Sequence, residues 1–259
     1  MSAQPSAPAV HSPSVSGILR ALLTADFTVQ TRNGRALLLT FFPPLVVLYG
    51  LSRTKRGAQL GGPFVNVALA LTLGIALIAI LGYTASVARD RELGVFQRLR
   101  VTPAPTWTIM VSRLVVQIVS MLAMAVVVLV AATVLENLTL DPAAYVLTLL
   151  MVIVSSAVFL GVGQALVGLI KSPDTVNAVG RLSFLPLVAL GLFGHSDIFG
   201  TTFETISRWS PGGVVATMLS GAMQPAAWSS ETWWALLVSV LYSIVFSAIG
   251  IRWFQWSAR

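Results

Sequence analysis

The chain contains no cysteine and only two histidines, His11 and His195. Without cysteine, disulfides, thiol nucleophiles and thiolate metal sites are excluded. Two histidines are too few for a histidine-rich metal centre. We therefore expect no catalytic residue, no metal and no cofactor in this chain.

Charged residues are also scarce, at 10% of the chain, whereas hydrophobic residues make up 56% and the mean hydropathy is +0.86. A soluble domain carries about 25% charged residues, so the composition indicates an all-α integral membrane protein. About 20 apolar residues cross a bilayer, and six apolar stretches leave no room for a second domain. We expect a disordered tail over 1–14, rich in Pro, Ser and Ala, and one membrane domain over 15–259.

Lysine occurs only at Lys55 and Lys171. A P-loop needs a lysine directly after its second glycine, where it meets the phosphates. Gly163 and Gly168 have the right mutual spacing, but Lys171 follows two positions too late. The sequence therefore predicts no ATP site in this chain, and these glycines indicate close helix packing instead.

The net charge of +7 is spread around the apolar stretches, which favours contact with anionic lipid over nucleic acid. The predicted spans cover about 36–52, 63–88, 107–135, 143–170, 182–199 and 232–251. Apolar residues at helical spacing over 15–35 predict an amphipathic helix, lying on the membrane or packed on the protein itself. The Gly-, Ser- and Thr-rich segment 195–230 predicts re-entrant or interfacial half-helices before the last span.

Cations are unequally divided by these six crossings. The side with both termini and the loops 89–106 and 171–181 holds twelve of the sixteen, and the other side holds four. By the positive-inside rule the twelve-cation side is cytoplasmic. The protein is therefore expected in the cytoplasmic (inner) membrane, with both termini inside the cell.

One loop stands out, the run RDRELGVFQRLRVTP from Arg89 to Pro103. Asp90 and Glu92 would occupy the first turn of a short helix, and arginines would occupy its last turn before Pro103. That order complements the helix dipole and marks both ends. We therefore predict a charged amphipathic helix over 89–105 between two spans.

Other polar residues lie within or beside the spans. His195, Ser196 and Asp197 are adjacent in sequence, so their side chains diverge and do not form a catalytic triad. Arg113 is interpreted as reaching toward the cytoplasmic surface. Helix-to-helix hydrogen bonds explain most scattered polar residues; those considered as lining a translocation path are Asn66, Thr84, Ser183 and His195.

The Arg89–Pro103 run resembles the cytoplasmic loop of type-2 ABC (ATP-binding cassette) exporter permeases, whose pattern is roughly Glu-x-Gly-Thr-Leu-Glu-x-Leu-Arg-x-Thr-Pro. The pattern is met at six positions: Glu92, Gly94, Leu99, Arg100, Thr102 and Pro103. It is not met at Val95, Phe96 and Gln97. Segments 15–35 and 195–230 also resemble the connecting helix and the re-entrant segment of such permeases. The compact chain is most similar to antibiotic and drug exporters of the daunorubicin-resistance type.

The resemblance implies a permease subunit that exports an amphiphilic or hydrophobic compound. Separate ATPase subunits would bind ATP and magnesium, and a second permease, identical or paralogous, would complete the assembly. The residues expected to couple to the ATPase are Arg89, Asp90, Arg91, Glu92, Leu93, Gly94, Phe96, Arg98, Leu99, Arg100, Thr102 and Pro103. The alternatives are export of a lipid or lipid-linked saccharide, and a membrane sensor or immunity protein that transports nothing.

Overall fold

A computed structural model describes residues 14–32, 34–54, 57, 60–95, 106–193 and 200–253. The described part contains helices and no strand. Its elements are α1 (Val15–Arg32), α2 (Gly34–Arg53), α4 (Pro63–Ala76), η1 (Leu77–Tyr83), α5 (Thr84–Glu92), α7 (Thr106–Leu135), α8 (Pro142–Leu169), α9 (Pro173–Phe193), α10 (Thr201–Trp209), α11 (Pro211–Ala222), η3 (Pro225–Ala227) and α12 (Ser230–Arg252). The predicted all-α class is confirmed for these residues.

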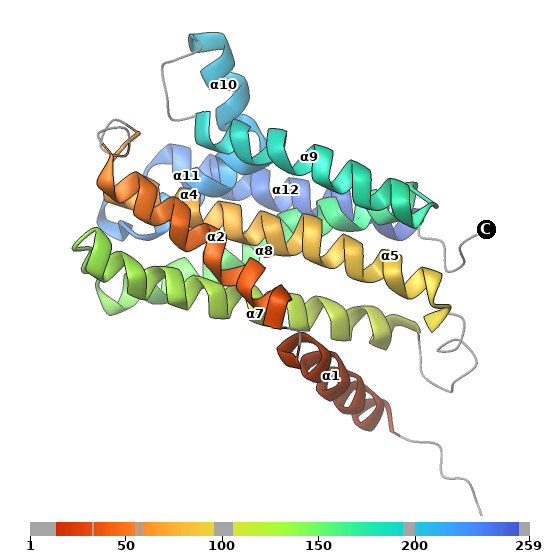
Figure 1. Ribbon diagram of the computed structural model, residues 1–259. Coiled ribbons are helices and arrows are strands. Elements are labelled where there is room, and N and C mark those ends of the chain that lie inside the picture. Colours follow the sequence, from red (N-terminus) through yellow and green to blue (C-terminus); the bar gives the residue numbers. More distant parts are fainter. Residues whose placement is uncertain are drawn as a thin grey trace, which may run out of the picture.

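The long helices lie side by side in one bundle (Figure 1). Among the described residues, four helices are long and apolar enough to cross a membrane: Pro63–Glu92, Trp107–Leu135, Pro142–Leu169 and Ser230–Arg252. Helices α2 and α9 run beside them, and both contain proline, at Pro43, Pro44 and Pro186. The chain is therefore a multi-pass helical membrane protein.

The helix Pro63–Glu92 forms the centre of the core, and it changes its winding halfway. Between α4 and α5 the π-helix η1 spans seven residues. Wider turns leave backbone carbonyls misaligned, and the Thr84 hydroxyl donates to the carbonyl of Ile80. Tyr83, at the end of η1, is 1% exposed and is among the largest fully buried side chains.

Helices α8 and α12 approach closely because glycines face each other. A Cβ built on Gly168 would lie 2.8 Å from the carbonyl oxygen of Gly250, and one on Gly250 would lie 2.6 Å from the carbonyl carbon of Gln164. Helices can pack this tightly only where side chains are absent. The interpretation of Gly163 and Gly168 as packing residues is confirmed, because Gly163 likewise lies against the Ala79 carbonyl of η1.

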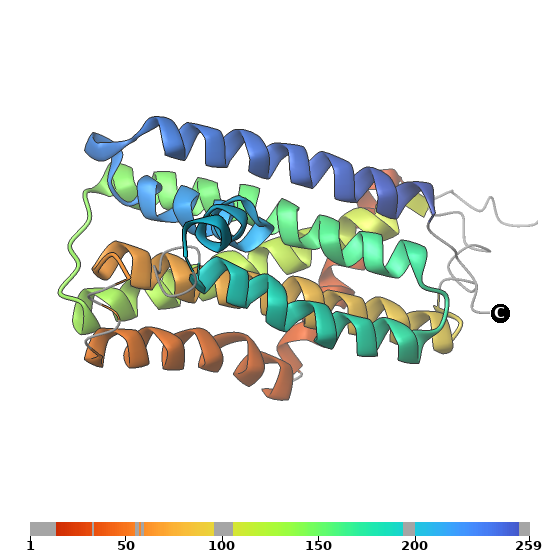
Figure 2. The ribbon, with the colours of Figure 1, turned by 90° about the horizontal axis from the view of Figure 1, so that it is seen from above.

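The two ends of the bundle differ (Figures 1 and 2). One end holds α1, the end of α5, the start of α7, the α8–α9 turn and the end of α12. The opposite end holds the end of α2, the α7–α8 turn, α10 and the 223–229 turn. The first described residue and the last therefore lie at the same end.

Helix α1 agrees with the amphipathic pattern predicted over 15–35, although it ends at Arg32. None of its residues is buried, and one face rests on α7. Leu22 packs against the core, and Ser112 of α7 donates to the Asp26 carboxylate at 2.7 Å. The helix therefore contacts the protein itself through both apolar and polar side chains.

The predicted loop 171–181 is wrong. Helix α9 begins at Pro173, with Ser172 before it and Asp174 in its first turn. The Ser172 hydroxyl accepts from the Thr175 backbone N–H at 3.4 Å, and proline fits the first helical turn. These polar residues start the helix at the end of the bundle, nine residues before the apolar stretch that predicted a span from 182. Its predicted end at 199 lies outside the described residues, as does most of the predicted tail 1–14.

In the described part of the segment before α12, two short α-helices, α10 and α11, are joined at Ser210, which agrees with the predicted half-helices. Helix α10 leans out from the bundle, whereas α11 lies within it and buries most of its residues (Figure 1). Ser210 caps α11 by accepting from the Gly213 N–H at 3.1 Å. A Cβ on Gly212 would lie 3.1 Å from the Cα of Gly191, so α11 begins directly against α9.

Candidate functional site

The charged run does not begin a new helix at Arg89. Helix α5 continues to Glu92 and is closed by a left-handed residue, Gly94, with φ +64°. The Leu93 N–H donates to the carbonyl of Arg89 at 3.0 Å, and the Gly94 N–H to that of Arg91 at 3.2 Å. This is a glycine C-cap. The prediction that Asp90 lies in a first helical turn is therefore wrong, because it lies near the end of α5.

The remainder of the predicted helix 89–105 falls outside the described residues. The coupling positions affected are Phe96, Arg98, Leu99, Arg100, Thr102 and Pro103. Among the described coupling positions, three side chains are exposed: Arg89, Glu92 and Leu93. These three leave the end of α5 with an outward face that carries both charges and an apolar side chain.

Asp90 points inward and forms an ion pair with Arg113 near the start of α7. Their side chains are only 16% and 15% exposed. Arg113 also donates to the Ser86 hydroxyl at 3.2 Å. The prediction that Arg113 reaches toward the cytoplasmic surface is corrected, because its guanidinium instead connects α7 to two positions of α5.

Arg91 is 4% exposed and turns toward the opposite neighbour, α8. Its guanidinium donates to the carbonyl of Val167 at 2.7 Å and to that of Ile170 at 3.0 Å. The last carbonyls of a helix lack partners within the helix and carry its negative dipole end. Arg91 therefore caps α8, and its side chain does not contribute to the exposed face at the end of α5.

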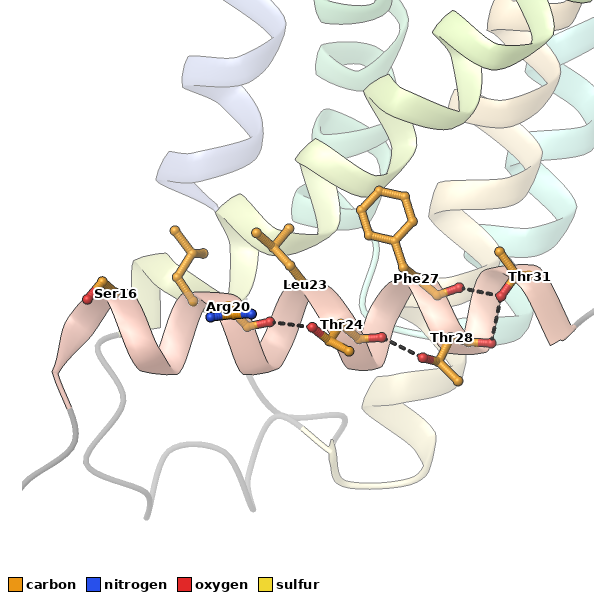
Figure 3. Close-up of a pocket in the computed structure, with 8 residues that line it drawn as sticks. Ser16, Arg20, Leu23, Thr24, Phe27, Thr28 and Thr31 are labelled. Carbon is orange, nitrogen blue, oxygen red and sulfur yellow. Dashed lines mark hydrogen bonds between the residues drawn. The ribbon is translucent and has the colours of Figure 1, made fainter.

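Helix α1 adds an open groove of about 540 Å³ at the same end of the bundle, lined by one face of the helix. Figure 3 shows Leu23 and Phe27 pointing from α1 toward the neighbouring helices. The hydroxyls of Thr24 and Thr28 donate to backbone carbonyls one turn earlier, at 2.9 and 2.7 Å. Because the hydroxyl protons of Thr24 and Thr28 are already donated to the backbone, the charged hydrogen-bond donor among the groove residues is Arg20.

Two of the residues considered as a translocation path, Asn66 and Thr84, lie far apart on the central helix and each has its own hydrogen bond. Asn66 is buried and donates to the Glu136 carboxylate at 2.9 Å, which ties the start of α4 to the end of α7. Thr84 bonds within its own helix. The two lie about 27 Å apart along the helix at 1.5 Å per residue. Ser183 is half-buried on α9, and His195 lies outside the described residues.

The opposite end of the bundle has an ion pair that the sequence did not suggest. Arg208 of α10 bonds Glu204 at 2.6 Å and Glu231 of α12 at 3.1 Å. Cavities of about 230 and 240 Å³ lie beside it, and both are lined by Arg208, Thr217 and Glu231. These two pairs are more exposed than Asp90–Arg113, with exposed fractions of 40% for Arg208, 24% for Glu204 and 65% for Glu231.

No group of three His, Cys, Asp or Glu side chains that could hold a metal ion occurs among the described residues. Several side-chain contacts there join helices, whereas the serine and threonine hydroxyls of the long helices mostly donate to carbonyls of their own helix. The contact between Asp26 and Ser112 was missed from the sequence, although an acid on α1 is a pattern from which a contact could have been proposed. Ser86 is one of the scattered polar residues for which a hydrogen bond between helices was expected, and it accepts one from Arg113.

A multi-pass helical bundle whose central helix ends in a charged, glycine-capped turn has the form of a transporter membrane domain. The family model described as the ABC-2 type transporter membrane domain matches residues 18–223, from α1 to just beyond α11. The match covers most of the chain, so the protein belongs to the ABC-2 type transporter family. A comparison with curated proteins finds no matching relative.

Proposed function

We propose that this chain is the permease subunit of an exporter that moves an amphiphilic or hydrophobic compound, drug-like or antibiotic-like, out of the cytoplasm. Membership of the ABC-2 family supports the proposal most directly. ATP would be bound with magnesium by separate ATPase subunits, because the sequence offers no P-loop lysine after its paired glycines. A second permease, a copy or a paralogue, would complete the assembly.

We propose six crossings, by α2, the continuous helix Pro63–Glu92, α7, α8, α9 and α12. The end of the bundle that carries α1 and the end of α5 would face the cytoplasm, in line with the twelve cations counted for that side. Helices α10 and α11 would then enter the membrane from the outside. Both termini would be cytoplasmic.

We place the contact with the ATPase at the end of α5 and the loop that follows it. Arg89, Glu92 and Leu93 are exposed there, with Leu93 at 61%. An exposed apolar side chain flanked by charges suits a docking surface, since charges orient the partner and apolar atoms give contact energy. Arg98 and Arg100 would extend this surface.

For the translocation path, Ser183 and His195 remain our proposal, on or just after α9. The hydrogen bonds of Asn66 and Thr84 argue for helix packing at those two positions. A path lined by α9 and the central helix Pro63–Glu92 would run between two permeases.

Co-purification tests the proposal. An affinity-tagged chain, purified from the membranes of its own cells, should retain an ATPase subunit, and the complex should hydrolyse ATP whereas the chain alone should not. Inverted vesicles holding the complex should then take up a fluorescent amphiphilic dye only with ATP. The matched control replaces the ATPase by a variant that binds ATP without hydrolysing it. If no ATPase is retained, the chain would instead fit a sensor or immunity protein.

A further inference from the structure

Two consecutive residues at the end of α5 reach in opposite directions. Asp90 pairs with Arg113 of α7, and Arg91 bonds the last carbonyls of α8. Gly94 then ends the helix, and the proposed docking loop begins. The end of the central helix is therefore held on two sides directly before the point where a partner's motion would arrive.

The contact made by Arg91 lies beside the connection from α8 to α9. Its two acceptors are Val167 and Ile170, and only Lys171 and Ser172 separate Ile170 from the start of α9. Hydrogen bonds from a charged donor are about twice as strong as those between neutral groups. Arg91 thus fixes the short α8–α9 turn to the end of α5.

The helices above this contact also leave little free space. A Cβ on Gly163 would meet the Ala79 carbonyl at 2.8 Å, and one on Gly180 of α9 would lie 3.4 Å from the Thr84 hydroxyl. The central helix therefore packs on the backbone of α8 and against α9, so that little space separates the three helices next to the Arg91 contact.

We propose that Arg91 is a positioning residue that makes the end of α5 and the α8–α9 turn move as one body. Motion arriving at the loop after Gly94 then passes to α9 as well as to the central helix. The inference rests on the proposed function for the source of that motion. The mechanical link itself is a property of this chain alone.

The absence of cysteine allows a direct test of the link. Cysteines introduced at Glu92 and Lys171, both exposed, receive spin labels on either side of the Arg91 contact. In the purified chain we expect strong dipolar broadening from one narrow distance distribution. Arg91→Met, of similar length but without donors, should remove most of that broadening, and Arg91→Lys should retain part of it.

Arg89→Met is the matched control, because Arg89 lies two residues away and is exposed. It should leave the broadening unchanged. If Arg91→Met gives the same spectrum as the control, the link does not exist. This result does not depend on any ATPase, so it is distinct from failure of the proposed function.

A second measurement in the complex separates positioning from simple stabilisation. Arg91→Met should still retain the ATPase and hydrolyse ATP, while the amount of fluorescent dye moved per ATP falls several-fold, and Arg91→Lys should recover part of that ratio. An equal loss of hydrolysis and dye uptake would overturn the positioning role. Arg208→Met, which alters a pair at the opposite end, should leave the ratio unchanged.

Discussion

Removing the cation from the Asp90–Arg113 pair should destabilise the protein strongly. In Arg113→Met the Asp90 carboxylate loses its ion-pair partner at a position where its side chain is only 16% exposed. Breaking such a buried pair costs about 3–5 kcal/mol. On the scale of soluble domains of this size, 1 kcal/mol shifts the Tm by about 2–4 °C, so the Tm should fall by about 6 °C or more.

The assay is thermal unfolding in detergent, with all variants scanned at the same rate because membrane proteins often unfold irreversibly. Arg208→Met is the matched control, since Arg208 is itself 40% exposed and its partners Glu204 and Glu231 are 24% and 65% exposed, and exposed pairs contribute about 0.2–1 kcal/mol. The double variant Asp90→Asn with Arg113→Met should recover much of the loss, because no unpaired charge remains. Equal Tm values for Arg113→Met and Arg208→Met would refute the reasoning.

The remaining predictions concern docking, orientation and packing. Replacing both Arg98 and Arg100 by glutamate should abolish co-purification of the ATPase while membrane insertion, measured by fractionation, is unchanged; retained ATPase would contradict a docking role. A reporter enzyme active only in the cytoplasm, fused after Arg259, should be active, and an inactive fusion that is present in full length would reverse the orientation. In Gly250→Ala the new Cβ would lie 2.6 Å from a backbone carbon of α8. This overpacking costs about 1–3 kcal/mol, so the Tm should fall by about 2 °C or more. Gly50→Ala is the control and should not lower the Tm, because no atom lies within 4 Å of its Cβ.

The long helices could be predicted closely from the sequence. Helix α7 differs by one residue at its start from the predicted 107–135, and α8 differs by one residue at each end from the predicted 143–170, because uninterrupted apolar runs of this length have few alternatives. The start of α9 was missed although Ser172, Pro173 and Asp174 form a helix-start signal. The polar residues of 171–181 were interpreted as a loop. They form the first turns of α9 at the end of the bundle, where a helix need not be apolar.

The contacts of the charged run could not be predicted. Asp90 pairs with Arg113 across the loop from α5 to α7, and the spacing of apolar residues does not indicate how that loop folds. Arg91 bonds carbonyls that are 76 and 79 residues away in the chain. Backbone acceptors leave no trace in the sequence, since every residue has one. Gly94 was the available signal for the end of α5, because a glycine after a helix commonly adopts the left-handed conformation.

The π-helix η1 determines which way those charged side chains face. Its wider turns accommodate about one residue more than an α-helix of the same number of turns, and one residue corresponds to about 100° of rotation. If Leu77–Tyr83 adopted regular α-helical winding, Asp90 and Arg91 would turn by about a quarter of a circle or more and would lose α7 and α8 together. The seven residues of η1 thus fix the rotation of α5 about the helix axis. Deletion of one of them would change the direction in which every side chain of α5 points.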